Sequence, residues 1–137
     1  MKKLYLALIL PCVLFSFPVL AEQSGIQPQT QGEVTFVSGG VGGEEQNALQ
    51  AMKADYNLNL LFSVQGTGEY LSDVKVTITD TRGNVFLETV ADGPKLFANL
   101  KAGRYIVTAD QNGRVQHKTA TVGGNHRTSL SFTWPQD

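Results

Sequence analysis

The two histidines of the chain, His117 and His126, are the first residues to consider for catalysis or metal binding. Zinc is held by cysteines and histidines whose spacing lets them meet at one point, for example four residues apart on a helix. His117 falls in the middle of a predicted strand and His126 beside the next turn, and neither has a neighbouring cysteine. The sequence also lacks a Gly-x-Ser-x-Gly elbow that would present a serine nucleophile. We therefore predict no catalytic, metal-binding or cofactor-binding residue, and no enzymatic activity.

Carboxylates offer a second candidate chemistry, the binding of calcium. If successive strands alternate in direction, the turns at Glu69, Asp73, Asp92 and Asp110 fall at one end of the sheet, together with Asn112. Calcium takes six to eight oxygen ligands, so four acids at one end would suit it. The competing interpretation is that Asp and Asn occupy turns because their side chains hydrogen-bond the local backbone. The sequence has no dense D-x-D-x-D run, and calcium stays a hypothesis beside the turn interpretation.

The glycine-rich run at 39–43 (GGVGG) precedes a predicted helix, as phosphate-binding loops do. Such loops end in Lys and Ser/Thr, whereas this one leads into Glu44 and Glu45, whose charges repel a phosphate. We interpret the run as a flexible joint. Glu and Ala residues favour a helix over 44–56, with Ala48, Leu49, Met52 and Tyr56 on one face. Residues 22–43 have little to bury and read as a flexible Gln/Gly-rich leader, with a short apolar run at 34–37 as a candidate edge strand.

From residue 57 onward, apolar and polar residues alternate between Gly-bearing turns, which is typical of half-buried antiparallel strands. The pattern predicts seven strands, at about 58–65, 73–80, 85–90, 95–100, 104–111, 114–122 and 127–134. Asn112-Gly113 is the strongest turn signal, because a type I′ hairpin needs positive φ at both positions. The residues predicted to point inward are Leu58, Leu60, Phe62, Val64, Val74, Val76, Ile78, Val85, Leu87, Leu96, Ala98, Leu100, Tyr105, Val107, Ala109, Leu130, Phe132 and Trp134. Seven short strands with one apolar face each predict an all-β, seven-stranded antiparallel β-sandwich over 57–137.

Five apolar residues, Leu61, Phe86, Val90, Phe97 and Ile106, fall on the opposite face of their strands. Either the helix at 44–56 covers some of them, or they form an exposed apolar patch. The apolar stripe of the helix favours the first interpretation. Under the second, Phe86, Phe97 and Ile106 are the candidate partner surface.

The first 21 residues predict a secretory signal peptide cleaved after Ala21, since a basic start leads into an apolar run with small residues before the cleavage site. Pro11 and Pro18 disfavour an uncleaved membrane anchor, and Pro11 also disfavours lipidation of Cys12. The remaining chain has nine basic and twelve acidic residues, a net charge of −3, and no cysteine. Nucleic acid and anionic membranes bind proteins with concentrated positive charge. Because this chain has a negative net charge, neither is an expected partner. We expect a periplasmic or secreted protein.

The stretches at 73–83, 90–94 and 96–109 resemble the transthyretin-like, carboxypeptidase regulatory-like domain family. The family has two strand patterns. The first, G-x-x-L-x-x-V-x-V, is matched by Gly68, Leu71, Val74 and Val76. The second, L-x-x-G-x-Y-x-V, is matched by Leu100, Gly103, Tyr105 and Val107. The resemblance covers roughly 57–134 and implies a sandwich fold of a kind found in small exported bacterial proteins without assigned activity. Hydroxyisourate hydrolases of the same fold need a C-terminal Tyr-Arg-Gly-Ser tail. This chain ends FTWPQD, so the resemblance does not imply that activity.

A fold of this kind does not by itself imply a function. We expect an exported, non-enzymatic binding module whose ligand is a protein or a glycan, without a cofactor. The alternative is a structural or accessory protein of the cell envelope that docks through its N-terminal helix.

Overall fold

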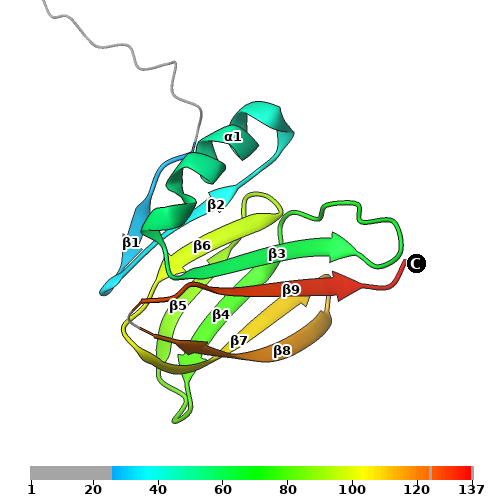
Figure 1. Cartoon of the computed structure of the whole chain (residues 1–137). Coiled ribbons are helices and arrows are strands. Elements are labelled where there is room, and N and C mark those ends of the chain that lie inside the picture. The colour runs from blue at the N-terminus through cyan, green and yellow to red at the C-terminus, as the bar shows by residue number, and fades with distance from the viewer. Residues whose placement is uncertain (1–25, 124, 137) are drawn as a thin grey trace, which may run out of the picture.

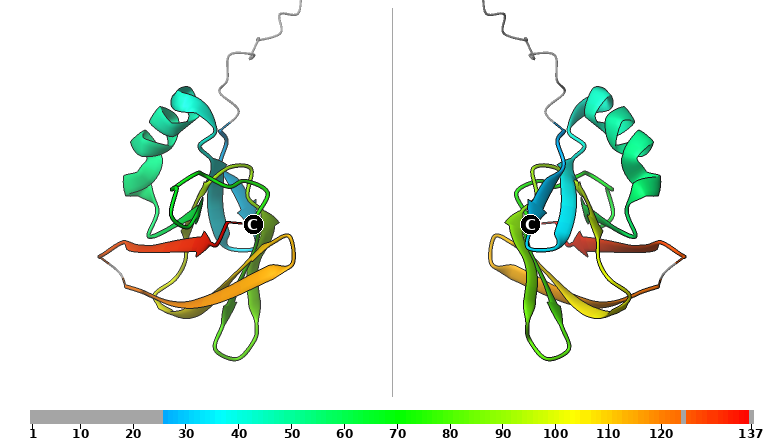
Figure 2. Two further views of the ribbon diagram at one scale, coloured as in Figure 1. Left: turned by 90° about the vertical axis from the view of Figure 1, so that its right-hand side faces the viewer. Right: turned by 90° about the vertical axis from the view of Figure 1, so that its left-hand side faces the viewer.

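The computed structural model describes residues 26–123 and 125–136. Two β-sheets pack face to face, and one helical segment lies on the outer side of one sheet (Figure 1). Figure 2 shows this helical segment standing to one side of both layers. The predicted signal peptide, residues 1–21, lies outside the described residues.

The first sheet, sheet A, has the strand order β1-β2-β6-β3-β9. Its strands are β1 (Gln29–Gln31), β2 (Val34–Gly39), β6 (Lys95–Asn99), β3 (Leu58–Val64) and β9 (Thr128–Trp134). The second, sheet B, has the order β5-β4-β7-β8. Its strands are β5 (Val85–Val90), β4 (Lys75–Asp80), β7 (Gly103–Gln111) and β8 (Arg114–Val122). The helical segment consists of the α-helix α1 (Gly42–Met52) and the 3₁₀ turn η1 (Lys53–Asp55).

All seven predicted strands are present, and the β-sandwich is confirmed. The prediction of seven antiparallel strands is wrong in two respects. The described chain contains nine strands, because β1 and β2 add a hairpin to sheet A, and β9 pairs with β3 in parallel. Alternation along a strand assigns its faces but not its direction, so the inward residues of β9 are the same for either pairing.

The leader predicted over 22–43 is too long, since the part from Gln29 to Gly39 belongs to sheet A. The glycine-rich run that follows is held in place by Glu45. Its Oε1 accepts hydrogen bonds from the backbone N–H groups of Gly40 and Val41, both at 3.1 Å. These amides, which a phosphate would need, are therefore already occupied by a carboxylate.

The core between the sheets is apolar and centres on three aromatic rings. Phe62, Phe132 and Trp134 are almost completely buried, with ring centroids 5.9 to 6.4 Å apart. Asn112 and Gly113 both have positive φ, +54° and +89°, as the hairpin prediction requires. The Tyr105 hydroxyl, on the strand after the Leu100–Gly103 turn, donates a 2.7 Å hydrogen bond to the carbonyl of Lys101 and ties that turn to β7.

One inward prediction is wrong, and a β-bulge explains it. The register between β4 and β5 shifts between Ile78 and Thr79, so that Ile78 faces Leu87 but Thr79 faces Val85. A bulge inserts an extra residue and reverses the side-chain alternation beyond it. Val85 is therefore 57% exposed. Phe86, the extra residue, instead packs against the Tyr105 ring at nearly a right angle, with centroids 5.6 Å apart and an interplanar angle of 89°.

Candidate functional site

The helical segment covers one half of the outer face of sheet A. Leu49 of α1 is fully buried there, against a cluster that also contains Ile26, Val37, Tyr56 and Phe97. The rings of Tyr56 and Phe97 lie 6.2 Å apart, and burial raises the pKa of the Tyr56 phenol, with Asp55 adding to the rise. The prediction that the helix covers apolar residues on this face is confirmed for Phe97.

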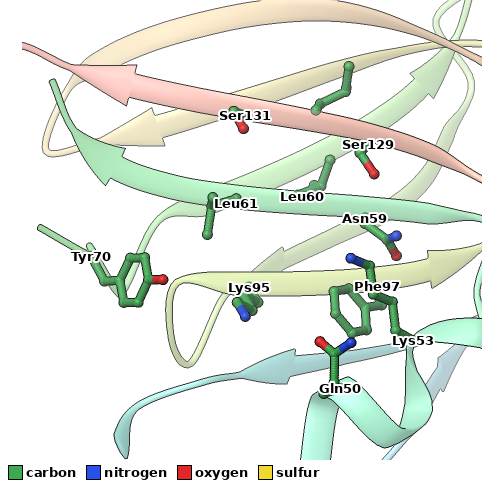
Figure 3. A pocket seen from close by; sticks show the side chains of 11 residues that line it. Gln50, Lys53, Asn59, Leu60, Leu61, Tyr70, Lys95, Phe97, Ser129 and Ser131 are labelled. Atoms are coloured by element: carbon green, nitrogen blue, oxygen red, sulfur yellow. The ribbon is translucent and has the colours of Figure 1, made fainter. Parts of the chain in front are cut away.

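The other half of this face, over β3 and β9, is left open along the flank of the helix. It forms a groove of about 220 Å³ (Figure 3). The residues that line it are Gln50, Lys53, Asn59, Leu60, Leu61, Tyr70, Lys95, Phe97, Ser129, Leu130 and Ser131. In Figure 3, Gln50 and Lys53 extend from the helical segment, while Tyr70 lies at the other end with its hydroxyl turned toward the groove.

The floor of the groove follows from strand register. Asn59 of β3 lies opposite Phe97 of β6 and Ser129 of β9, and makes one row across the three strands. Two residues further along β3, Leu61 lies opposite Lys95 and Ser131 in a second row. Because side chains in a strand alternate between faces, all six of these residues point outward from sheet A.

Asn59 is the most unusual residue in the groove. Its side chain is only 6% exposed, yet within the part of the chain that the structure describes neither Oδ1 nor Nδ2 has a hydrogen-bond partner. Most buried polar side-chain atoms in folded proteins are hydrogen-bonded, and leaving one unpaired costs about 1–3 kcal/mol. Both atoms are also closed to solvent, so the amide can pair with a ligand only once the side chains that cover it have moved aside.

The groove is positively charged. Lys53 and Lys95 are its only ionised groups, since the lining contains no Asp, Glu or Arg. Lys101 pairs with Glu33 away from the groove, and over residues 26–123 and 125–136 no carboxylate lies within 4.0 Å of Lys53 or Lys95. The remaining polar groups are the amide of Gln50 and the hydroxyls of Tyr70, Ser129 and Ser131.

Replacing Asn59 with leucine is expected to stabilise the protein, because leucine has a similar branched shape and leaves no polar atom unpaired. The expected gain is about 1–3 kcal/mol, or a rise in melting temperature of about 4 °C for each kcal/mol. Thermal unfolding followed by circular dichroism measures it.

Asn57→Leu is the matched control for this substitution. The Asn57 side chain donates to the carbonyl of Leu100 at 2.8 Å and accepts from its amide at 3.0 Å, so its loss should lower the melting temperature. Equal destabilisation by both variants would contradict the unpaired state of Asn59.

The predicted partner residues Phe86, Phe97 and Ile106 do not form one surface. Phe97 lies on sheet A and is 3% exposed under the helix, so it is not available to a partner. Phe86 and Ile106 lie on sheet B, where Phe86 is turned by the bulge toward Tyr105 and Ile106 is half-buried. The alternation of side chains along a strand does not show to which sheet the strand belongs. It also does not reveal the bulge.

The acids predicted at one end of the sandwich do not gather into a cation site. Among the described residues, which include Glu69, Asp73, Asp92 and Asp110, no three His, Cys, Asp or Glu side chains are placed to hold a metal ion. Asp110 accepts a hydrogen bond from the amide of Gly113 at 2.8 Å, as the turn interpretation expects. His117 pairs with the hydroxyl of Thr108 through Nδ1, at 2.9 Å.

Among the residues that line the groove, Phe97 was predicted from the sequence as part of a partner surface and Leu61 as an outward apolar residue, but the polar residues were not predicted. Asn59, Ser129 and Ser131 occupy outward positions in their strands, where polar residues ordinarily face water. Asn59 is buried only because the helix packs on sheet A beside it. The local sequence does not predict where the helix packs.

Within the described residues, the helices are too short or too polar to span a membrane. Comparison with known protein families finds no family model that matches the chain, and comparison with curated proteins finds none that matches it.

Proposed function

We propose that this protein is an exported, non-enzymatic β-sandwich binding module, and that the groove on the outer face of sheet A holds its ligand, a glycan or part of a protein. The observation that carries the proposal is the buried and unpaired amide of Asn59. Binding sites combine concave shape with a few convergent polar groups, and the two rows across β6, β3 and β9 supply both.

The side chains that line the groove support binding rather than catalysis. They include no histidine, cysteine or carboxylate, the groups that most often act as nucleophile or general acid–base catalyst. The two lysines of the lining, Lys53 and Lys95, are both partly exposed, and within the described residues no carboxylate pairs with either.

The resemblance to the transthyretin-like, carboxypeptidase regulatory-like domains is part of this proposal, as is export. Two features are compatible with that family. One is the two-sheet sandwich, and the other is the hydrogen bond from the Tyr105 hydroxyl to the Lys101 carbonyl within the L-x-x-G-x-Y-x-V stretch. The sequence of residues 1–21 supports delivery to the periplasm or beyond. The alternative, docking through the helix, has less support because the apolar face of α1 is already buried against sheet A.

Chemical-shift mapping tests the groove as a binding site. We expect a panel of millimolar sugars, sugar acids and short peptides to contain at least one probe that shifts the backbone amides of Asn59, Leu61, Ser129 and Ser131 together. Asn59→Leu should abolish those shifts while remaining folded. A panel that leaves these amides unmoved, or moves them equally in Asn59→Leu, would contradict the proposed site.

A further inference from the structure

We infer that the ligand of this groove is a carboxylated sugar of the hexuronic acid class, either free or as a residue of an acidic glycan. The inference rests on the proposed binding function and adds the chemical class of the ligand. It follows from three properties of the lining: its charge, its hydrogen-bonding groups and its size.

The charge of the groove selects an anion. Lys53 borders it from η1 and Lys95 from β6, and neither is neutralised by a carboxylate within the described residues. Hydrogen bonds between an ammonium and a carboxylate are about twice as strong as those between neutral groups. A ligand with one carboxylate therefore gains more from either lysine than a neutral ligand of the same shape.

The hydrogen-bonding groups select a ligand with several hydroxyls. Asn59 offers a donor and an acceptor side by side, and both are free within the described chain. Hydroxyl groups both donate and accept, so neighbouring ring hydroxyls match an amide of this kind. The hydroxyls of Ser129 and Ser131 continue the same two rows on β9. Tyr70, which is 49% exposed, adds a phenol hydroxyl that is turned toward the groove in Figure 3.

The size of the groove limits the ligand to one or two rings. Its volume of about 220 Å³ suits a short ligand better than an extended peptide. The large aromatic side chain in its floor, Phe97, is 3% exposed, so little of that ring is open to an apolar group of a ligand. Figure 3 shows Asn59 pointing from β3 toward the helical wall, where Gln50 and Lys53 have long flexible side chains. These two side chains would need to move aside for a hydroxyl to reach the Asn59 amide, whose atoms are closed to solvent in the free protein.

The test compares probes that differ only in charge. We expect D-glucuronate or D-galacturonate to shift the groove amides and to bind at least about tenfold more tightly than glucose, galactose or the methyl ester of the same uronic acid, a difference of about 1.4 kcal/mol. The preference should weaken as salt rises, because the lysines are partly exposed. Isothermal titration measures the affinities and chemical-shift mapping locates the site.

The double variant Lys53→Gln/Lys95→Gln should lose this preference and bind acid and neutral sugar alike. Lys101→Gln is the matched control, since Lys101 pairs with Glu33 outside the groove and its removal should leave the preference intact. Equal affinity for uronate and glucose in the unmodified protein would overturn the ligand class while leaving the binding function standing. Tighter binding of a peptide carboxylate, with acetyl-Ala-Ala as the probe, would overturn the class in the same way. Absence of groove shifts with all these probes would count against the binding function itself.

Discussion

Replacing Trp134 with alanine is expected to destabilise the protein by about 3–5 kcal/mol, the range for deleting a large buried aromatic side chain. Trp134 is 1% exposed, and its ring packs against Phe62 and Phe132 in the centre of the core. Its Nε1 also donates a 2.9 Å hydrogen bond to the carbonyl of Arg114, at the start of β8. The residue therefore joins the last strand of sheet A to the neighbouring edge of sheet B.

Urea unfolding followed by far-ultraviolet circular dichroism measures this effect, since the variant lacks the chain's one tryptophan and its fluorescence. Trp134→Phe is the control that separates the two contributions. It keeps an aromatic ring in the core and removes the hydrogen bond, so the expected loss is smaller than for alanine. A loss below about 1 kcal/mol for Trp134→Ala would be inconsistent with a buried position, because large-to-small core substitutions cost more than this.

Replacing Gly93 with alanine is expected to cost about 3 kcal/mol, near the upper end of the usual range for overpacking. Gly93 lies in the connection between β5 and β6, directly against the end of β2. An alanine Cβ there would lie 2.5 Å from the carbonyl carbon of Gly39 and 2.9 Å from its Cα, in addition to a closer approach to the Gly39 oxygen. These are backbone atoms of a paired strand, so neither side of the contact yields easily.

Gly43→Ala is the matched control for this substitution. Gly43 lies in α1, and a Cβ at this position meets nothing within 4 Å. Alanine is favoured over glycine inside a helix by about 0.5–1 kcal/mol, so this variant should be slightly more stable than the unmodified protein. Thermal melts of the two variants should therefore shift in opposite directions. A melt of Gly93→Ala that matches the unmodified protein would show that the two segments are not in contact.

Much of the fold was predictable because alternation reports burial directly. The strand over 85–90 was placed at its observed bounds, and the turn at 112–113 has the backbone that Asn-Gly favours. The features that were missed depend on contacts distant in sequence or on a single inserted residue. The parallel pairing of β9 with β3 and the exposure of Val85 are the clearest cases.

The candidate site was less predictable than the fold. Each of its polar residues, taken alone, is an ordinary position on a strand, in the helical segment or in a loop. Asn59 becomes a candidate binding group only after α1 packs on Val37 and Phe97 and the helical segment closes over one side of β3. The apolar side chains on one face of the predicted helix indicated that the helix would cover a sheet face. They did not indicate which half of that face would be left open.

The pairing of β3 with β9 also bears on the order in which the chain folds. Leu58 pairs with Thr128, seventy positions further along the chain, so sheet A closes only after a long stretch has been brought together. Contacts of such long sequence separation slow folding, since loop-closure entropy is lost before the contact contributes. Until β9 docks, β3 presents an open edge of unpaired N–H and C=O groups, which is the kind of surface through which partly folded chains associate. The docking of β9 therefore sets how long the edge of β3 stays open to association with other chains.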